Sequence, residues 1–211
     1  MIFIFDLDGT LIDSSDRMYN LFCELIPECQ LTKCEYWNYK RNKISHQILL
    51  DKLYPQHSFE DFNSVWMNKI ESEYYLGMDY NYLDTKDVLE VLKGSGNCLL
   101  LLTARQSKDG LMNELNRLGL LEFFDNVLTA EGKRSKEDVL LEYASHNACI
   151  LDENNCFISD MGKDIQLAKK YGYRTVAISH GFMSREKLEE YHPDVLIDEL
   201  SELLYLPHTT V

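Results

Sequence analysis

The sequence predicts an α/β protein with a doubly wound parallel sheet and a helical insertion after the first strand. Short apolar runs recur along the chain, and segments with helical spacing separate them. Strands that alternate with helices in this way form parallel sheets with helices on both faces. A long stretch rich in aromatic residues, from about 14 to 81, breaks this alternation and predicts the insertion.

The first strand is the apolar run from Ile2 to Phe5, which ends at Asp6-Leu7-Asp8-Gly9-Thr10. A fully buried strand that leads into a functional loop has this pattern. Helices are expected from Asp84-Thr85, a candidate N-cap, to Lys93 and over Gly110–Leu118. Five further strands are expected, at Cys98–Thr103, Asn126–Ala130, Cys156–Ser159, Thr175–Ser179 and Val195–Ile197.

The insertion is predicted to cover 14–81, so the core domain comprises 1–13 and 82–211, with short hinges near Asp13 and Tyr82. The insertion has several helix-like segments and no convincing buried strand. Its aromatic residues are expected to form a core of their own. They are Tyr19, Phe22, Tyr36, Trp37, Tyr39, Phe62, Trp66, Tyr74 and Tyr75.

The composition of the chain argues against several classes of protein. A formal net charge of −14 disfavours a duplex nucleic-acid binder, whose affinity would come from Lys and Arg, and favours a small-molecule substrate. No apolar stretch is long enough to cross a bilayer, and no signal-peptide pattern precedes the first strand. The cysteines form no CxxC pair, which favours reduced thiols. We therefore expect a cytoplasmic monomer or homodimer without nucleic-acid or membrane partners. The cysteines are Cys23, Cys29, Cys34, Cys98, Cys149 and Cys156.

Asp6 and Asp8 stand at the carboxyl end of the first strand, where open parallel sheets bind their ligands. Two carboxylates with one residue between them repel each other in a site without water, unless a cation or a shared proton compensates their charge. Mg²⁺ takes one or two carboxylates together with water and phosphate oxygens, so it suits this pair. An ordinary Asp-Gly surface turn is the alternative.

The run from Phe5 to Ser14 resembles the DxDGT motif of the haloacid dehalogenase-like hydrolase superfamily. The resemblance implies that Asp6 is the nucleophile, and that Asp8 is the acid/base that protonates the leaving oxygen and then activates water. It also implies a Rossmann-like core, a phosphoaspartyl intermediate and Mg²⁺ as cofactor. An Asp at the position of Asp8 favours phosphoryl transfer over dehalogenation.

The second and third motifs of the family supply contacts to the phosphoryl group. Thr103, at the end of a buried strand and followed by Ala104 and Arg105, matches the Ser or Thr that holds a phosphoryl oxygen. Lys136, in the first turn of a predicted helix, matches the phosphate-binding lysine, with Lys133 as the alternative. The resemblance therefore implies phosphate binding by Thr103, Ala104 and Lys136, whereas Arg105 contacts either substrate or solvent.

The segment from Phe157 to Asp164 resembles the fourth motif, GDxxxD, with Ser159 where Gly is common. Asp160 is expected to bind the metal, and Asp164 either coordinates it or orients a metal-bound water. An acidic residue stabilised at a helix N-terminus is the alternative for Asp164. The expected metal ligands are Asp6, Asp8, Asp160 and Asp164.

The insertion resembles the helical cap of the phosphoglycolate phosphatase and β-phosphoglucomutase branch, which closes over the site and contacts the substrate. The basic cluster Lys40–Lys43 could meet a second anionic group, although a solvated helix face is the simpler interpretation. Likewise His46 and His57 fit surface or packing positions, and His180 fits either the mouth of the site or a surface loop.

The sequence therefore predicts a Mg²⁺-dependent phosphatase that hydrolyses a small phosphorylated metabolite. One alternative is a phosphosugar mutase, which returns the phosphoryl group to another hydroxyl of the sugar. The other is a non-catalytic regulatory protein that keeps the fold for binding.

Overall fold

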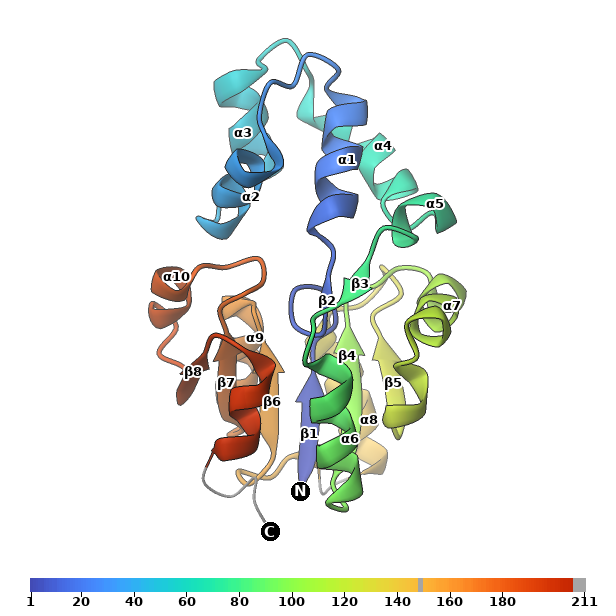
Figure 1. Cartoon of the computed structure of the whole chain (residues 1–211), viewed down its shortest axis with the longest axis vertical. Coiled ribbons are helices and arrows are strands. Elements are labelled where there is room, and N and C mark those ends of the chain that lie inside the picture. Colours follow the sequence, from blue (N-terminus) through green and yellow to red (C-terminus); the bar gives the residue numbers. More distant parts are fainter. Residues whose placement is uncertain (148–149, 207–211) are drawn as a thin grey trace.

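The computed structural model describes residues 1–147 and 150–206, so Cys149 and the end of the predicted core, 207–211, lie outside the described residues. Six strands form one sheet in the order β5-β4-β1-β6-β7-β8, and every neighbouring pair is parallel (Figure 1). The α/β prediction is confirmed, and each predicted strand boundary lies within one residue of the observed one. The strands are β1 (Ile2–Phe5), β4 (Cys98–Thr103), β5 (Asn126–Thr129), β6 (Cys156–Ser159), β7 (Arg174–Ile178) and β8 (Val195–Ile197).

Helices cover both faces of the sheet because alternate strand residues point to opposite sides. Phe3 and Phe5 of β1 join one apolar cluster with α6 (Thr85–Gly94), α7 (Lys108–Leu118) and the 3-10 helix η3 (Leu200–Tyr205). Ile4, between them in sequence, joins a second cluster with α8 (Lys136–His146) and α9 (Gly162–Lys170). The sheet is therefore buried on both faces. The remaining short core helices are η1 (Leu121–Phe123) and α10 (Arg185–Glu189).

The cap stands beyond the carboxyl ends of the strands (Figure 1). Many of its apolar residues, from Met18 to Met78, form a cluster separate from those of the core. Most of the aromatic residues predicted there belong to this cluster, whereas the side chain of Tyr74 is 71% exposed. The cap helices are α1 (Ser15–Leu25), α2 (Lys33–Arg41), α3 (His46–Leu53), α4 (Phe59–Lys69) and α5 (Glu73–Leu76).

Two short antiparallel strands, β2 (Ile12–Asp13) and β3 (Tyr80–Asn81), carry the chain between core and cap. The helix after this hinge begins as predicted, but Asp84 does not cap it, since its carboxylate accepts a hydrogen bond from the amide of Ser201. Thr85 instead donates its hydroxyl hydrogen to the carbonyl of Leu11, at 2.8 Å. This hydroxyl ties the start of α6 to the first loop of the core.

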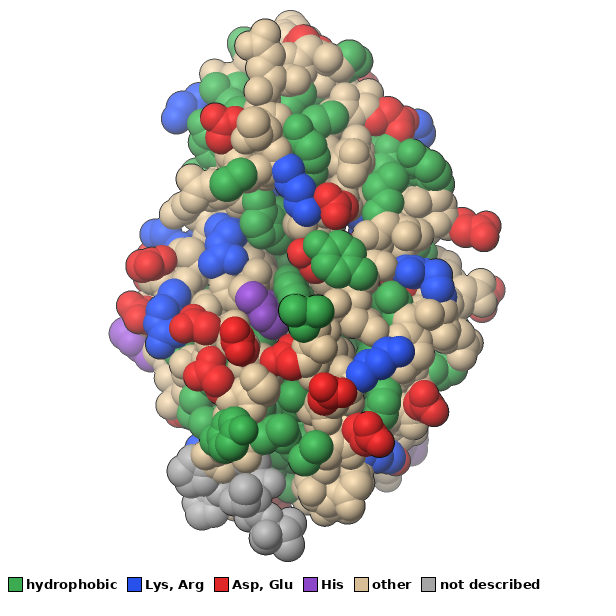
Figure 2. Space-filling model, in the orientation of Figure 1, with side chains coloured by type: hydrophobic (Ala, Val, Ile, Leu, Met, Phe, Trp, Pro, Cys, Tyr) green, Lys and Arg blue, Asp and Glu red, His purple; other side chains and the backbone are tan. Residues whose placement is uncertain are grey.

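The surface reflects the acidic composition. Acidic side chains gather over the core half of the face in view, with basic side chains scattered among them (Figure 2). In the described ranges 1–147 and 150–206, no helix is both long and apolar enough to span a lipid bilayer. None of the five cysteines in those ranges forms a disulfide.

Candidate active site

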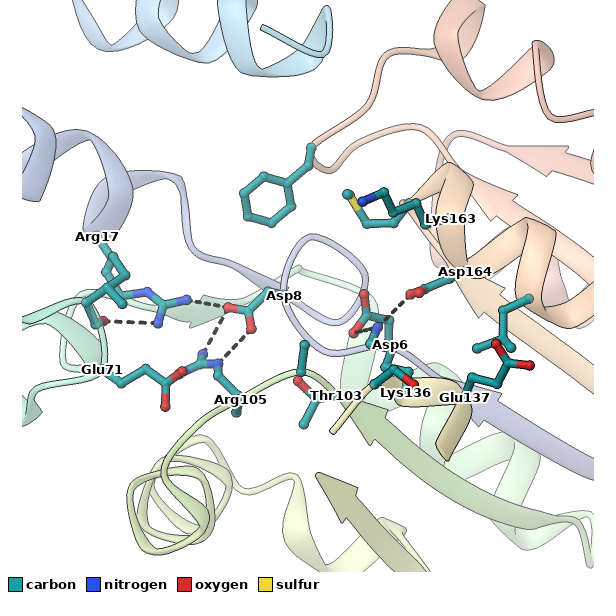
Figure 3. Close-up of a pocket in the computed structure, with 16 residues that line it drawn as sticks. Asp6, Asp8, Arg17, Glu71, Thr103, Arg105, Lys136, Glu137, Lys163 and Asp164 are labelled. Carbon is teal, nitrogen blue, oxygen red and sulfur yellow. Dashed lines mark hydrogen bonds and ion pairs between the residues drawn. The ribbon is translucent and has the colours of Figure 1, made fainter. Parts of the chain in front are cut away.

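A cavity of about 620 Å³ lies between the carboxyl ends of the strands and the cap (Figure 3). The core lines it with both aspartates of the first loop, Asp6 and Asp8, and with residues at the end of β4 and in the first turns of α8 and α9. The cap contributes Arg17, Ile70 and Glu71. Residues from distant parts of the sequence thus line the same cavity.

The first loop and the fourth motif form one structural unit. Gly9 has φ +80°, and a Cβ there would lie 2.2 Å from Oδ2 of Asp160, so only glycine fits. The hydroxyl of Thr10 lies 3.1 Å from Oδ1 of Asp160 and accepts a hydrogen bond from the Asp160 amide, also at 3.1 Å. The Gly-Thr pair after the two aspartates therefore holds Asp160 in place.

Asp160 itself is fully buried behind the residues that line the cavity. The amide of Phe182, after β7, donates to its Oδ2 at 2.6 Å. Burial, and next the nearby carboxylate of Asp6, raises the pKa of Asp160 well above its ordinary value. A cation nearby would favour the charged form of this group.

Lys136 lies between two carboxylates on one side of the cavity. Its Nζ is 2.7 Å from Oδ1 of Asp6 and 2.5 Å from Oδ2 of Asp164. Ser135 caps α8 through a hydrogen bond from the Asp138 amide, which places Lys136 in the first turn of the helix. Burial raises the pKa of Asp6 to about 7, although Lys136 acts to lower it.

The structure thus brings Lys136, rather than the fallback Lys133, to Asp6. Lys133 is exposed and does not line the cavity. Burial would lower the pKa of Lys136, but Asp164 and Asp6 overcome that effect and raise it. Ser159 donates its hydroxyl hydrogen to Asp164 at 2.9 Å, so the serine in the place of the family glycine helps to hold that carboxylate.

Asp8 points to the opposite side, toward two arginines (Figure 3). Nε of Arg105 lies 2.7 Å from its Oδ2 and Nη2 lies 2.9 Å from its Oδ1, while Arg17 donates to Oδ1 as well. Burial alone would raise the pKa of Asp8, but Arg105 and Arg17 hold it well below its usual range. In this arrangement Asp8 is a carboxylate with both oxygens occupied.

Two more buried acids stand behind these arginines. Asp79, just before β3, lies 3.2 Å from Nε of Arg17 and 3.3 Å from Nη2 of Arg105. Glu114 of α7 lies 2.9 Å from the same Arg105 nitrogen. Burial raises the pKa of Asp79 to about 8 and also raises that of Glu114. Arg105 therefore contacts a buried network and also lines the cavity, so the solvent alternative for it was wrong.

Some of the other residues predicted for the site line the cavity, whereas others make structural contacts elsewhere. Thr103 and Ala104 line the cavity, as expected for phosphate contacts. His180 does not line it: this half-buried residue lies in the loop after β7, its ring stacks on Tyr82 at 3.7 Å, and Nε2 lies 3.1 Å from the carbonyl of Thr10. His46 packs among the aromatic rings of the cap, with Nε2 2.8 Å from the hydroxyl of Tyr36.

The basic cluster of the cap does not face the cavity. Arg41 donates to three carbonyls of the loop after β7, at 2.7 Å to Ser179, 3.1 Å to His180 and 3.2 Å to Gly181. Lys43 forms an ion pair with Glu190 at 3.0 Å. Arg41 and Lys43 therefore dock the cap on the core, and no residue of the cluster lines the cavity that could take a substrate anion.

Glu71 provides a second docking point that the sequence did not reveal. Its carboxylate accepts hydrogen bonds from the amides of Gln106, at 2.9 and 3.0 Å, and of Ser107, at 2.9 Å. Arg17, Asp79 and Glu114 were missed as well. No local pattern marks any of these residues, because their partners lie far away in the sequence.

The donor set fits a hard divalent cation. Within residues 1–147 and 150–206, no three His, Cys, Asp or Glu side chains converge closely enough to hold a metal by themselves. Mg²⁺, however, needs only one or two carboxylates and completes its shell with water and phosphate oxygens. Asp6, Asp160 and Asp164 are all buried, and Lys136 pairs with Asp6 and Asp164, so a further positive charge would compensate the excess of negative charge.

Comparisons with known proteins agree with this geometry. A family model described as haloacid dehalogenase-like hydrolase matches residues 3–178. The chain is 26% identical over 216 residues to the pyrophosphatase PpaX of Bacillus mycoides, covering 95% of this chain and 94% of that protein. It is 24% identical over 212 residues to the phosphoglycolate phosphatase of Aliivibrio fischeri, covering 95% and 93%. A solved haloacid dehalogenase-like family hydrolase from Streptococcus pneumoniae matches with a TM-score of 0.78 and 21% identity, covering 97% of this chain and 96% of that one.

Proposed function

The chain belongs to the haloacid dehalogenase-like hydrolase family, and we propose that it is a Mg²⁺-dependent phosphatase of small phosphomonoesters with Asp6 as nucleophile. The family and the enzyme class predicted from the sequence are confirmed. The identity of the metal, the covalent intermediate and the role of each residue belong to the proposal.

One observation carries the proposal: Asp6 ends β1 with its carboxylate 2.7 Å from Nζ of Lys136, in a cavity also lined by Thr103 and Ala104. A transferring phosphoryl group spreads its charge over three oxygens and needs a cation and hydrogen-bond donors around it. Lys136 and Thr103 supply these beside a carboxylate that can attack. A nucleophile and the hydrogen-bond donors that a phosphoryl group needs therefore lie at the same end of the cavity.

The chemistry follows from these positions. A carboxylate oxygen of Asp6 bonds to phosphorus as the bond to the leaving oxygen breaks, and Asp8 donates a proton to that oxygen. Asp8 then accepts a proton from the water that attacks phosphorus, which releases inorganic phosphate and restores Asp6. Lys136, Thr103 and Ala104 hold the phosphoryl oxygens in both steps.

Mg²⁺ would supply positive charge to the phosphate oxygens and keep Asp6 ionised. Asp6 and Asp160 are the residues best placed to hold it, with Asp164 as a further ligand or as an orienter of metal-bound water. The carboxylate of Asp8 would join the predicted ligand set only after leaving its arginines. We also propose that the substrate is a soluble phosphorylated metabolite in the cytoplasm, and that the enzyme is a monomer or a homodimer.

Phosphate release from a panel of phosphomonoesters tests the proposal. Wild type, Asp6→Asn and, as a matched control, Asp51→Asn at an exposed position of α3 are assayed with Mg²⁺ and with EDTA. We expect release that needs both Mg²⁺ and Asp6, with a loss of about 10⁴-fold or more in Asp6→Asn and none in Asp51→Asn. Release that persists in Asp6→Asn would overturn the mechanism, and substrate conversion without phosphate release would favour the mutase.

A further inference from the structure

The loop between β7 and α10, residues 179–184, lies between the cap and the fourth motif. On the cap side, Arg41 at the end of α2 donates to three consecutive carbonyls of this loop (Figure 1). Within residues 1–147 and 150–206, no other hydrogen-bond donor reaches these three carbonyls. On the core side, the amide of Phe182 donates to Asp160. The loop therefore contacts the cap on one side and the expected metal ligand on the other.

A single peptide group makes both contacts. The carbonyl of Gly181 accepts a hydrogen bond from Nη1 of Arg41 at 3.2 Å. On the other side of the same peptide bond, the N–H of Phe182 donates to Oδ2 of Asp160 at 2.6 Å. A peptide group is planar, so a donor that fixes the direction of its carbonyl also fixes the direction of its N–H. A positive charge at the carbonyl oxygen also polarises the group and strengthens its N–H as a donor.

The carboxylate of Asp160 depends on this peptide group for its position. Its Oδ1 lies 3.1 Å from the hydroxyl of Thr10, and its Oδ2 accepts the hydrogen bond from Phe182. The backbone of Gly181 packs so closely that a Cβ there would lie 2.2 Å from Oδ2. A shift of the peptide group would therefore move Oδ2. Each carboxylate oxygen still has a lone pair left for a metal.

Other contacts hold the ends of the loop and leave this peptide group to Arg41. The amide of Ser179 donates to a carbonyl of β8 at 2.9 Å. At the other end, the buried Met183 accepts a hydrogen bond from the amide of Gly162 on its sulfur, at 3.1 Å. Neither contact reaches the carbonyl of Gly181. Loss of Arg41 would thus release the peptide group between two fixed points.

We propose that Arg41 is a positioning residue for Asp160, so that docking of the cap strengthens the binding of the divalent metal. This inference rests on the metal role of Asp160 in the proposed function. Arg41 does not line the cavity and acts only through the peptide group between Gly181 and Phe182. Because such coupling is reciprocal, the bound metal should in turn favour the docked cap.

Metal affinity tests the inference, with Mn²⁺ as the probe and the EPR signal of the free ion as the readout. Arg41→Met keeps the stem of the side chain but removes its three hydrogen bonds to the loop. We expect the Kd for Mn²⁺ to rise by about 10-fold, as for other groups that hold a metal ligand in place. Loss of a positive charge alone would lower this Kd, so a purely electrostatic role predicts the opposite direction. Asp160→Asn should abolish the binding and thereby identifies the site.

Lys43→Met is the matched control. It also removes one positive charge and one contact between cap and core, the ion pair with Glu190 at 3.0 Å. The partners of Lys43, Glu190 and the ring of Tyr191, follow α10 and lie outside the loop. The Kd of Lys43→Met should stay within about 2-fold of wild type, because a half-exposed ion pair contributes little. An unchanged or lower Kd in Arg41→Met, or an equal rise in both variants, would overturn the inference.

If Arg41→Met does not fold, Arg41→Lys takes its place. A lysine keeps the charge but lacks the planar fork of donors that spans three carbonyls, so the Kd should still rise by about 3-fold or more. An unchanged Kd in this variant would overturn the inference.

Hydrogen exchange separates this inference from the proposed function. A protein that binds Mn²⁺ at Asp160 but hydrolyses no phosphomonoester would refute the phosphatase alone. If Asp160→Asn binds Mn²⁺ as well as wild type does, the metal role of Asp160 fails. Exchange of the Phe182 amide in the metal-free protein then decides whether Arg41 positions Asp160. Exchange about 10-fold faster in Arg41→Met, and unchanged in Lys43→Met, would support the inference. Equal exchange rates in the two variants would reject it.

Discussion

The two aspartates of the first loop are separated by a single residue, yet they lie in opposite surroundings. Asp6 meets one lysine and neighbouring carboxylates, and burial raises its pKa to about 7. Asp8 meets two arginines, which hold its pKa below the usual range despite burial. Around Asp6 the carboxylates outnumber the cations, so this side fits a metal. Around Asp8 two arginines supply the positive charge.

The two aspartates differ in which parts of the chain contact them. Around Asp6, every contact is made by the core, from motif residues at the ends of strands and starts of helices. Around Asp8, the cap supplies Arg17 and the hinge region supplies Asp79. Changes on the first side should therefore affect catalysis, and changes on the second should affect both stability and the docking of the cap.

The largest expected effect comes from removing Arg105. Arg105→Met leaves the buried carboxylates of Asp8, Asp79 and Glu114 without one of their two cations. It should destabilise the fold by roughly 3 to 5 kcal/mol, measured by urea unfolding. Arg185→Met, which removes a half-exposed ion pair with Asp198, should cost less than about 1 kcal/mol. Equal stabilities for the two variants would contradict the view that the Asp8 side stabilises the fold.

Removing Lys136 tests the other side. Lys136→Met should lower kcat/KM by about 10² to 10³-fold, because a preorganised cation would no longer meet the charge on the phosphoryl oxygens. Lys133→Met, at an exposed lysine three residues earlier, is the control and should leave kcat/KM unchanged. A comparable loss in Lys133→Met would show that the wrong lysine has been assigned to phosphate.

The docking point at Glu71 should have a smaller effect. Glu71→Gln keeps the size of the side chain but replaces a charged acceptor of three amide hydrogen bonds with a neutral one. The free energy of unfolding should fall by about 1 to 2 kcal/mol, measured by urea unfolding. Glu73→Gln, on an exposed side chain two residues later, should have little effect. Identical losses in both variants would mean that Glu71 does not stabilise cap docking.

Asp79 should make the stability of the fold depend on pH. Burial raises the pKa of Asp79 to about 8 in the folded state, whereas in the unfolded chain its pKa is about 4. The folded protein thus retains a proton that the unfolded chain has lost, so Asp79 makes stability fall as pH rises from about 4 to 8. The melting temperature of Asp79→Asn relative to wild type should therefore increase from pH 5 to pH 8. A difference in melting temperature that stays constant or decreases from pH 5 to pH 8 would contradict the raised pKa of Asp79.

The sheet and the Asp6 side could be predicted because both follow from local patterns. Apolar runs mark the strands, and parallel topology brings the ends of β1, β4 and β6 to one edge. Residues that follow those ends, such as Asp6, Thr103 and Asp160, must then lie close together. Lys136 was predictable because Ser135 caps the helix that presents it.

The Asp8 side could not be predicted, because its contacts depend on how the cap sits on the core. Arg17 and Glu114 fit ordinary polar positions of amphipathic helices, yet both are almost fully buried. Ninety-seven residues separate Asp8 from Arg105 in sequence, and no periodic pattern links them. The stacking of His180 on Tyr82 could not be predicted for the same reason, since Tyr82 lies at the hinge.

Trapping the covalent intermediate tests the central claim most directly. Wild type and Asp8→Asn are mixed with substrate and Mg²⁺, quenched, and treated with borohydride, which reduces an aspartyl phosphate to homoserine. Peptide mass spectrometry should find this conversion at Asp6. Conversion at another residue, or none in either protein during active turnover, would contradict the assignment of Asp6 as nucleophile.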